Sequence, residues 1–546
     1  MKLGPSLLYA PVMLACIAIV FMSVYSYSWS STLINLNCSI QDDSFYYFVP
    51  AWNESHGAGF TFGGEKTSGF QPLYELLLTS LSYFTPSLES LLRAAINLNG
   101  WLFAATALLC GFTLRPLIRS FAPGLRYEAT ALSMLVGGLT YLCLHAAFFN
   151  SVTGKENALA AMLLAAMIWM AFTDRHDRYH AILVGALCGL LLVTRVAPAS
   201  FLYVGIAIAL VHGWKGKIIA TAICLLPVTA WALFAHEYFG HVLPMSMLVK
   251  MTTPSHLTVI QSIKGGLKYG WESWKFSVSA ASRFNVLQLP FRDGLRTHAQ
   301  ISIMVATLGL ALLGALKSLL GRSPKRAVLA LVAFDCAGVL SNVLFGAAQA
   351  GRSDDMYYTV WYLYDLPVLV AINCGFAVGW LQSSLTALRA EGKIAAVLLI
   401  GCVIYFFGDV AWYARLRPYD ASDDAKFAAS WPVKKHEAAD WFLKHVKPVN
   451  SGYKVIAFSA GTVDYYLFDH VVNLDGLANN AAGEALMASG SAIEYAKQVR
   501  PDYLIDYCDA EKEFSNLRRL YSFPFSERVS YCVDEFIYNN ERSASR

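Results

Sequence analysis

The stretch that decides the fold covers residues 41–78 and reads QDDSFYYFVPAWNESHGAGFTFGGEKTSGFQPLYELLL. It opens with adjacent carboxylates, Asp42 and Asp43, just after an apolar segment (7–29) long enough to span a membrane. Neighbouring Asp side chains suppress each other's ionisation unless a cation or a proton-accepting role uses them. The pair therefore indicates general-base or metal-binding chemistry at the lip of a bilayer, and a solvated loop start is the alternative.

The composition is that of a membrane protein. Hydrophobic residues make up 56% of the 546 residues and charged residues only 15%, whereas soluble domains average about 25% charged residues. The net charge of +4 is small, and the basic residues are distributed by membrane side instead of forming one patch. We therefore expect membrane lipids, and no nucleic acid, as partners.

Segments of about twenty apolar residues predict membrane spans. Eleven are expected, a count open by one or two because the fifth and sixth are short: residues 7–29, 91–114, 128–149, 157–172, 181–194, 198–211, 218–235, 301–320, 327–348, 359–381 and 394–412. The basic loops all fall on one side under this count, which makes that side cytoplasmic. Asp42, Asp43 and the chain after Trp412 are then exoplasmic, as expected for an integral protein of a bacterial inner membrane with its active site on the periplasmic face.

Two domains are expected. Residues 1–412 form the transmembrane module, with exoplasmic loops at 30–90 and 237–299 and an interfacial helix in each loop. Residues 413–546 form a small exoplasmic α/β domain, because strand and helix patterns alternate there. Its expected helices cover residues 437–446, 461–468 and 492–499, and its expected strands cover residues 454–458, 471–474 and 503–506. A disulfide between Cys508 and Cys532 is possible in an oxidising compartment.

The first loop resembles that of a known superfamily. Its order of motifs is DDxFYY, then N-x-x-x-G-x-G-F-T-F, then T-S-G-F-x-P-L, and its glycines suit close approach to a ligand. This order is similar to the first exoplasmic loop of the GT-C superfamily of polytopic glycosyltransferases, which includes protein mannosyltransferases, aminoarabinose transferases and arabinofuranosyltransferases. The resemblance implies a mainly α transmembrane helix bundle of GT-C type.

The resemblance also implies catalytic residues. Asp43 is the expected general base, and Asp42 is expected to orient it or to bind a divalent cation, Mg²⁺ or Mn²⁺; no other cofactor is expected. A second GT-C element, G-x-E-x-x-L, matches residues 154–159 and adds Glu156 to the catalytic candidates. Lys155 departs from the apolar residue usual at its place. For Glu156 the alternative is a charge that favours the N-terminus of a helix.

Several other residues are candidates for substrate binding. Arg195, between apolar segments, is expected to contact a phosphate or to snorkel to the interface. Arg352 precedes W-Y-L-Y-D-L-P, which is similar to an R-x-W-Y-x-x-x-x-P element of the family, and is the other candidate for holding phosphate. The remaining candidates are His241 and Lys250 in YFGHVLPMSMLVK, Tyr46 in the aromatic run after the acidic pair, and Asp365 near the exoplasmic end of a span. Asp475, in N-L-D-G-L, is either a turn residue or part of acceptor binding.

These features predict an inverting glycosyltransferase that moves a monosaccharide from a polyprenyl-phosphate donor. A lipid-linked donor is expected because the exoplasm holds no nucleotide sugars. The acceptor, a glycan, a lipid or a protein, stays open. The main alternative is a transporter or flippase of a lipid-linked sugar, although the carboxylates gather at one face and the halves do not match. A third reading is transfer of a preassembled glycan from a diphosphate carrier, with Glu272 as its weak second metal ligand.

Overall fold

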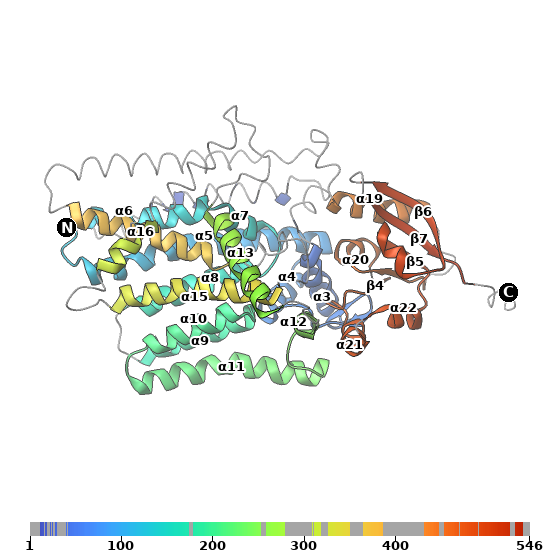
Figure 1. Ribbon diagram of the computed structural model, residues 1–546, viewed down its shortest axis with the longest axis horizontal. Helices are drawn as coiled ribbons and strands as arrows, with labels where there is room; N and C mark the ends of the chain where they lie inside the picture. The colour runs from blue at the N-terminus through green and yellow to red at the C-terminus, as the bar shows by residue number, and fades with distance from the viewer. Residues whose placement is uncertain are drawn as a thin grey trace, which may run out of the picture.

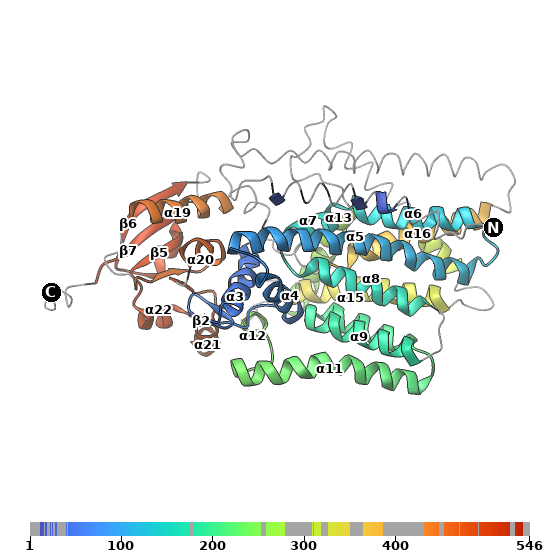
Figure 2. The ribbon, with the colours of Figure 1, turned by 180° about the vertical axis from the view of Figure 1, so that it is seen from behind.

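The computed structural model describes residues 42–173, 178–252, 258–278, 311–317, 326–349, 364–385, 431–446, 452–468, 470–489, 491–524 and 530–538, with Leu308, Gly309 and single positions between 11 and 40. Within these residues the molecule has two parts, which meet at the first loop (Figure 1). A bundle of long helices forms one part, and a small sheet with its covering helices forms the other. Seen from behind, helices α3 (Phe45–Ser55) and α4 (Pro72–Ser82) of the first loop lie between them (Figure 2).

Four helices of the described chain are long and apolar enough to cross a membrane. They are α5 (Leu88–Phe121), α11 (Gly213–Phe239), most of α15 (Arg326–Gln349) and most of α16 (Leu366–Leu385). Three shorter apolar helices accompany them: α8 (Asn157–Phe172), α9 (Arg178–Thr194) and α10 (Pro198–Leu210). The expected mainly helical membrane fold is confirmed. The expected spans 301–320, 359–381 and 394–412 lie wholly or partly outside the described residues.

One expected span is not a single helix. Residues 128–149 divide into α6 (Tyr127–Cys143) and α7 (His145–Val152). Between them Leu144 takes an extended conformation, with φ −71° and ψ 121°. Hydropathy alone predicted one continuous helix, because it measures apolar character and not backbone direction.

The first loop contains most of the short elements next to the acidic pair. A 3-10 turn, η1 (Asp42–Ser44), leads into α3 (Phe45–Ser55), a two-stranded ribbon β1 (Thr61–Phe62) and β2 (Glu65–Lys66), and α4 (Pro72–Ser82). Helices α3 and α4 run parallel, because Tyr47 lies against Tyr74 at 5.5 Å between ring centroids and Ser55 against Ser82 at 2.7 Å. Helix α4 is the expected loop helix. The second loop contributes α12 (Met245–Thr252) and α13 (Val259–Val278).

The C-terminal domain is built on a five-stranded sheet in the order β4-β3-β5-β7-β6. The strands β3 (Val455–Ala457), β4 (Val471–Asn473) and β5 (Tyr503–Tyr507) are parallel, whereas β6 (Leu517–Pro524) and β7 (Ser530–Phe536) join antiparallel at one edge. The helices are α19 (Trp431–His445), α20 (Gly461–Leu467), α21 (Asn480–Ser489) and α22 (Ile493–Val499). The expected α/β pattern is confirmed, and α21, β6 and β7 are additions to it. Cys508 and Cys532 form the disulfide that the sequence analysis left open.

The two faces of this sheet have different cores. On one face Ile456 packs with residues of α22. On the other face its neighbours Val455 and Ala457 pack with α19 and α20, and also with Tyr46, Val49 and Phe62 of the first loop. Successive side chains of a strand point to opposite faces, so β3 contributes to both cores. The first loop is therefore part of the core of the C-terminal domain, although some 370 residues separate them.

Candidate active site

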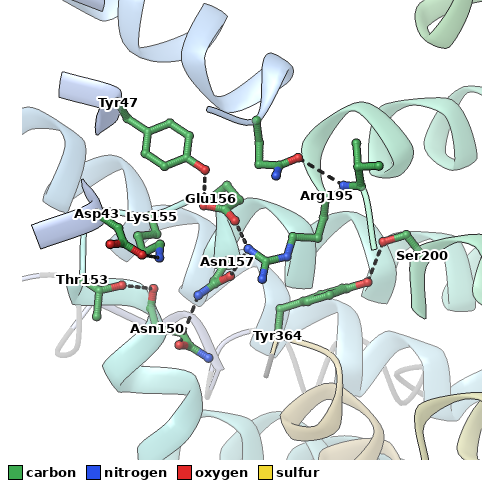
Figure 3. Close-up of polar contacts among 12 residues, drawn as sticks. Asp43, Tyr47, Asn150, Thr153, Lys155, Glu156, Asn157, Arg195, Ser200 and Tyr364 are labelled. Carbon is green, nitrogen blue, oxygen red and sulfur yellow. Dashed lines mark hydrogen bonds and ion pairs between the residues drawn. The ribbon is translucent and has the colours of Figure 1, made fainter. Parts of the chain in front are cut away.

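Asp43 forms an ion pair with Lys155, the residue that departs from the family pattern. The Nζ atom of Lys155 lies 3.0 Å from Oδ2 of Asp43 (Figure 3). The Lys155 side chain is 5% exposed and that of Asp43 is 31% exposed, so the carboxylate can meet a substrate while its counter-ion is buried. A cation at this distance favours the ionised carboxylate, which is the form that accepts a proton.

The loop that carries Lys155 is fixed against the first loop from several sides. Gly154 has φ +78°, and a Cβ there would lie 2.7 Å from the ring of Phe48, so only glycine fits. Its carbonyl accepts a hydrogen bond of 3.1 Å from Tyr74. The carbonyl of Lys155 accepts another of 3.0 Å from Asn99 of α5. These contacts hold the Lys155 backbone where its side chain reaches Asp43.

Glu156 is buried and bonded on both oxygens. Tyr47 donates a hydrogen bond of 2.8 Å to Oε2, and Arg195 forms an ion pair with Oε1 (Figure 3). Arg195 also donates to Asn157 at 3.3 Å. Glu156 occupies the position before α8, but its side chain makes no capping hydrogen bond there. Its contacts are therefore tertiary. The Glu156 carboxylate compensates the positive charge of Arg195. Binding of a phosphate by Arg195 remains a prediction.

Asp42 points into the C-terminal domain. Its Oδ1 atom accepts hydrogen bonds of 2.8 Å from both the backbone N–H and the hydroxyl of Thr462. Its Oδ2 atom lies 3.0 Å from Nζ of Lys435, whose side chain is fully buried. Lys435 also donates to the carbonyl of Ser459 at 2.8 Å. Asp42 thus joins the two parts of the molecule, whereas Asp43 faces the helix bundle.

Two glycines of the first loop also pack against the C-terminal domain. A Cβ at Gly63 would overlap the carbonyl oxygen of Val471, and one at Gly69 would overlap that of Leu477. Backbone therefore lies directly on backbone at both places, which a side chain on either glycine would prevent. We expected these glycines to approach a ligand; at Gly63 and Gly69 they approach the C-terminal domain instead.

Tyr46 lies at the same interface. Its hydroxyl donates to Oδ2 of Asp475 at 3.1 Å and accepts a hydrogen bond of 3.1 Å from Asn473. Asp475 is half-buried, and Leu477 donates its backbone N–H to Oδ1 at 2.7 Å. Removal from water and the negative charge of Asp43 raise the pKa of the Asp475 carboxyl to about 7. In the structure the Tyr46 hydroxyl orients the Asp475 carboxylate. The predicted contact of Tyr46 with substrate remains a prediction.

His241 joins three segments. Its Nδ1 atom lies 2.8 Å from the carbonyl oxygen of Leu243, and Nε2 lies 3.2 Å from Nδ2 of Asn480 and 3.5 Å from Oγ of Ser68. Donation from Nδ1 leaves Nε2 to accept, which is the neutral tautomer. These contacts fit a structural role, and the predicted phosphate contact of His241 remains a prediction. Lys250 belongs to α12, and its side chain lies outside the described residues, as does Arg352.

Asp365 has protein partners for both oxygens. Tyr203 donates to Oδ2 at 2.7 Å, and the backbone N–H of Leu366, the first residue of α16, donates to Oδ1 at 2.9 Å. The carboxylate is 2% exposed. Asp365 therefore lies directly before α16 and is bonded to Tyr203 of α10. Its predicted place in a substrate cavity remains a prediction.

A further buried acid lies on α4. Glu75 is fully buried, and neither of its oxygens has a hydrogen-bond partner within the described chain. Burial and the negative charge of Glu54 raise its pKa well above the ordinary value. No pattern in the sequence indicated this residue, because Glu75 is one polar position in an otherwise apolar helix. As for metals, no group of three or more His, Cys, Asp and Glu is found in the described part of the chain. Binding of Mg²⁺ or Mn²⁺ by Asp42 thus remains a prediction.

Sequence reasoning missed three residues that complete the site. In the sequence, Lys155 was noted only because it replaces the apolar residue usual in the G-x-E-x-x-L element; its pairing with Asp43 was not predicted. No pattern in the sequence indicated Lys435 or Thr462, because their partner Asp42 is 393 and 420 residues away in the chain, respectively. Such pairs depend on how the domains dock, which no local pattern encodes.

The described chain thus combines a membrane helix bundle, a first loop that carries the acidic pair and a C-terminal α/β domain docked on that loop. The sequence matches no family model, and no curated protein matches it. Solved structures do. ArnT from Cupriavidus metallidurans in the apo state has a TM-score of 0.54 and 11% identity over 96% of this chain and 98% of that chain.

Two further structures are similar. ArnT from Cupriavidus metallidurans bound to undecaprenyl phosphate has a TM-score of 0.51 and 12% identity, with 96% of this chain and 98% of that chain covered. The archaeal oligosaccharyltransferase AglB from Archaeoglobus fulgidus, in complex with an inhibitory peptide and a dolichol-phosphate, has a TM-score of 0.47 and 12% identity over 91% of this chain and 70% of that chain. At these identities the similarity to ArnT shows the fold, and it confirms the GT-C fold that the first loop predicted.

Proposed function

We propose that the protein is an inverting glycosyltransferase that moves a monosaccharide from a polyprenyl-phosphate donor to an exoplasmic acceptor. One observation carries the proposal: in a GT-C fold, Asp43 is a part-exposed carboxylate with a buried Lys155 as its counter-ion. The similarity to ArnT bound to undecaprenyl phosphate supports the donor class. The apolar helices support a site reached from the lipid.

The reaction follows from the chemistry of the two groups. Asp43 accepts the proton of an acceptor hydroxyl as its oxygen attacks the anomeric carbon of the donor. The bond between that carbon and the phosphate oxygen breaks, and polyprenyl phosphate leaves with the electron pair. Attack from the side opposite the phosphate inverts the configuration. Lys155 is the counter-ion of the Asp43 carboxylate before the reaction. Its positive charge also stabilises the negative charge that develops on the leaving phosphate.

The test is a matched pair of variants in lipid nanodiscs. Binding of undecaprenyl phosphate is followed by tryptophan fluorescence, and turnover by release of undecaprenyl phosphate from a panel of its monosaccharide derivatives. Asp43→Asn keeps the size of the side chain but removes the base, so we expect normal binding and turnover about 10² to 10⁴ times slower. Exposed Glu65→Gln, in the same loop, is the control and should behave as wild type.

Two results would contradict the proposal. Wild-type protein that neither binds undecaprenyl phosphate nor releases it from any donor of the panel would exclude this donor class. Normal turnover in Asp43→Asn, at equal folded amounts, would exclude Asp43 as the base.

A further inference from the structure

Asp475 is a carboxylate of the C-terminal domain that the proposed reaction leaves without a role. It follows β4 in a turn, and both of its oxygens accept hydrogen bonds, from Leu477 N–H at 2.7 Å and from the Tyr46 hydroxyl at 3.1 Å. Asn473 in turn donates to Tyr46 at 3.1 Å. The position of this carboxylate is therefore fixed by both domains.

Asp475 lies within reach of the charge of Asp43. Tyr46 comes three residues after Asp43 where η1 continues into α3, a spacing that brings two side chains to the same side of a helical turn. The contacts of Asp42 with Thr462 and Lys435 dock the C-terminal domain at this turn. The negative charge of Asp43 contributes to the raised pKa of Asp475, as it does to that of Tyr46.

The two carboxylates have different partners. Asp43 is paired with the cation of Lys155. The described contacts of Asp475 are with neutral donors, among them a backbone N–H, a phenol hydroxyl and the side-chain amide of Asn473, and no ion pair to it occurs within the described chain. A carboxylate oxygen has room for a second hydrogen bond. A half-buried carboxylate without a cation is suited to a neutral ligand that donates hydrogen bonds, such as a hydroxyl group.

We infer that Asp475 binds a second hydroxyl of the acceptor, beside the hydroxyl that Asp43 deprotonates. This inference rests on the proposed function and adds the acceptor class to it. An acceptor that uses both carboxylates has at least two neighbouring hydroxyls, as a saccharide does and a single Ser or Thr side chain does not. Asp475 acts in binding and orientation, and Asp43 takes the proton.

The variant Asp475→Asn separates this role from a purely structural one. The amide oxygen of Asn still accepts from Leu477, so the turn is retained, but an amide is a weaker acceptor than a carboxylate. Asp440→Asn, an exposed carboxylate of α19 that pairs with Lys444, is the matched control in the same domain.

The experiment measures transfer to methyl glycosides, transfer to a Ser/Thr peptide, and hydrolysis of the donor by water. For Asp475→Asn we expect the KM for the methyl glycoside to rise about tenfold or more. Hydrolysis and undecaprenyl phosphate binding should stay within twofold of wild type. Wild-type KM for the glycoside should rise as the pH falls through about 7, because protonation removes the acceptor, and Asp475→Asn should lose this pH dependence.

The outcomes are distinguishable. An unchanged glycoside KM and pH profile in Asp475→Asn, or a peptide used as well as the glycosides by wild type, would overturn the inference and leave the proposed function standing. Wild-type protein without undecaprenyl phosphate binding and without hydrolysis of the donor panel would overturn both. If the KM for the methyl glycoside rose equally in Asp475→Asn and Asp440→Asn, the role of Asp475 would be that of a turn residue only, and the inference would be wrong.

Discussion

Asp42 and Lys435 form a buried ion pair of 3.0 Å between the first loop and helix α19. Removal of one partner of such a pair leaves an uncompensated charge and typically costs about 3 to 5 kcal/mol. We expect Asp42→Ala and Lys435→Met each to lower the thermal midpoint of the purified protein, and the double variant to recover part of the loss. Additive effects in this double-mutant cycle would show that the pair does not couple the two domains.

The close backbone contact at Gly69 predicts a second stability effect. A Cβ at this position would overlap the carbonyl oxygen of Leu477, so Gly69→Ala must separate the first loop from the C-terminal domain. We expect faster cleavage between the domains in limited proteolysis, and lower activity. Gly452→Ala is the control, because a Cβ there meets no atom within 4 Å. Equal cleavage rates for the two variants would contradict the docking described above.

Glu75, whose oxygens have no hydrogen-bond partner among the described residues, predicts a pH-dependent stability. Its pKa in the folded protein is raised above the ordinary value of 4.5, so the unfolded chain loses this proton first as the pH rises. The wild type therefore loses stability above about pH 4.5, by up to about 1.4 kcal/mol per pH unit. Glu75→Gln cannot lose a proton, so its thermal midpoint should equal that of wild type near pH 5 and exceed it at pH 8. A constant difference across this range would exclude the titration of Glu75.

The contacts between Asp42 and the C-terminal domain also predict topology. Asp42 and the C-terminal domain must lie on the same side of the membrane, which the basic loops predict to be the exoplasmic side. A membrane-impermeant maleimide added outside intact cells should label Ala58→Cys and Ser515→Cys, two exposed positions, above the wild-type background. Label at either position only after the membrane is opened would contradict this orientation.

The choice between two adjacent carboxylates shows what sequence reasoning lacked. Asp42 and Asp43 are chemically identical neighbours, and the sequence favoured Asp43 as the base without a strong reason. Their surroundings differ, because Thr462 and Lys435 contact both oxygens of Asp42, whereas Asp43 is part-exposed beside Lys155. These partners are more than 100 residues away along the chain in every case.

The sequence by itself determined the membrane class, the position of most helices, the α/β pattern after Trp431 and the GT-C fold. These features depend on hydrophobic length, on periodicity and on short motifs, which are local properties of a chain. Only the tertiary structure decided that Glu156 pairs with Arg195, that Gly63 and Gly69 pack against the C-terminal domain, and that Asp475 is oriented by Tyr46. Such contacts form when distant segments bury surface together, and their partners are set by the shape of the whole fold.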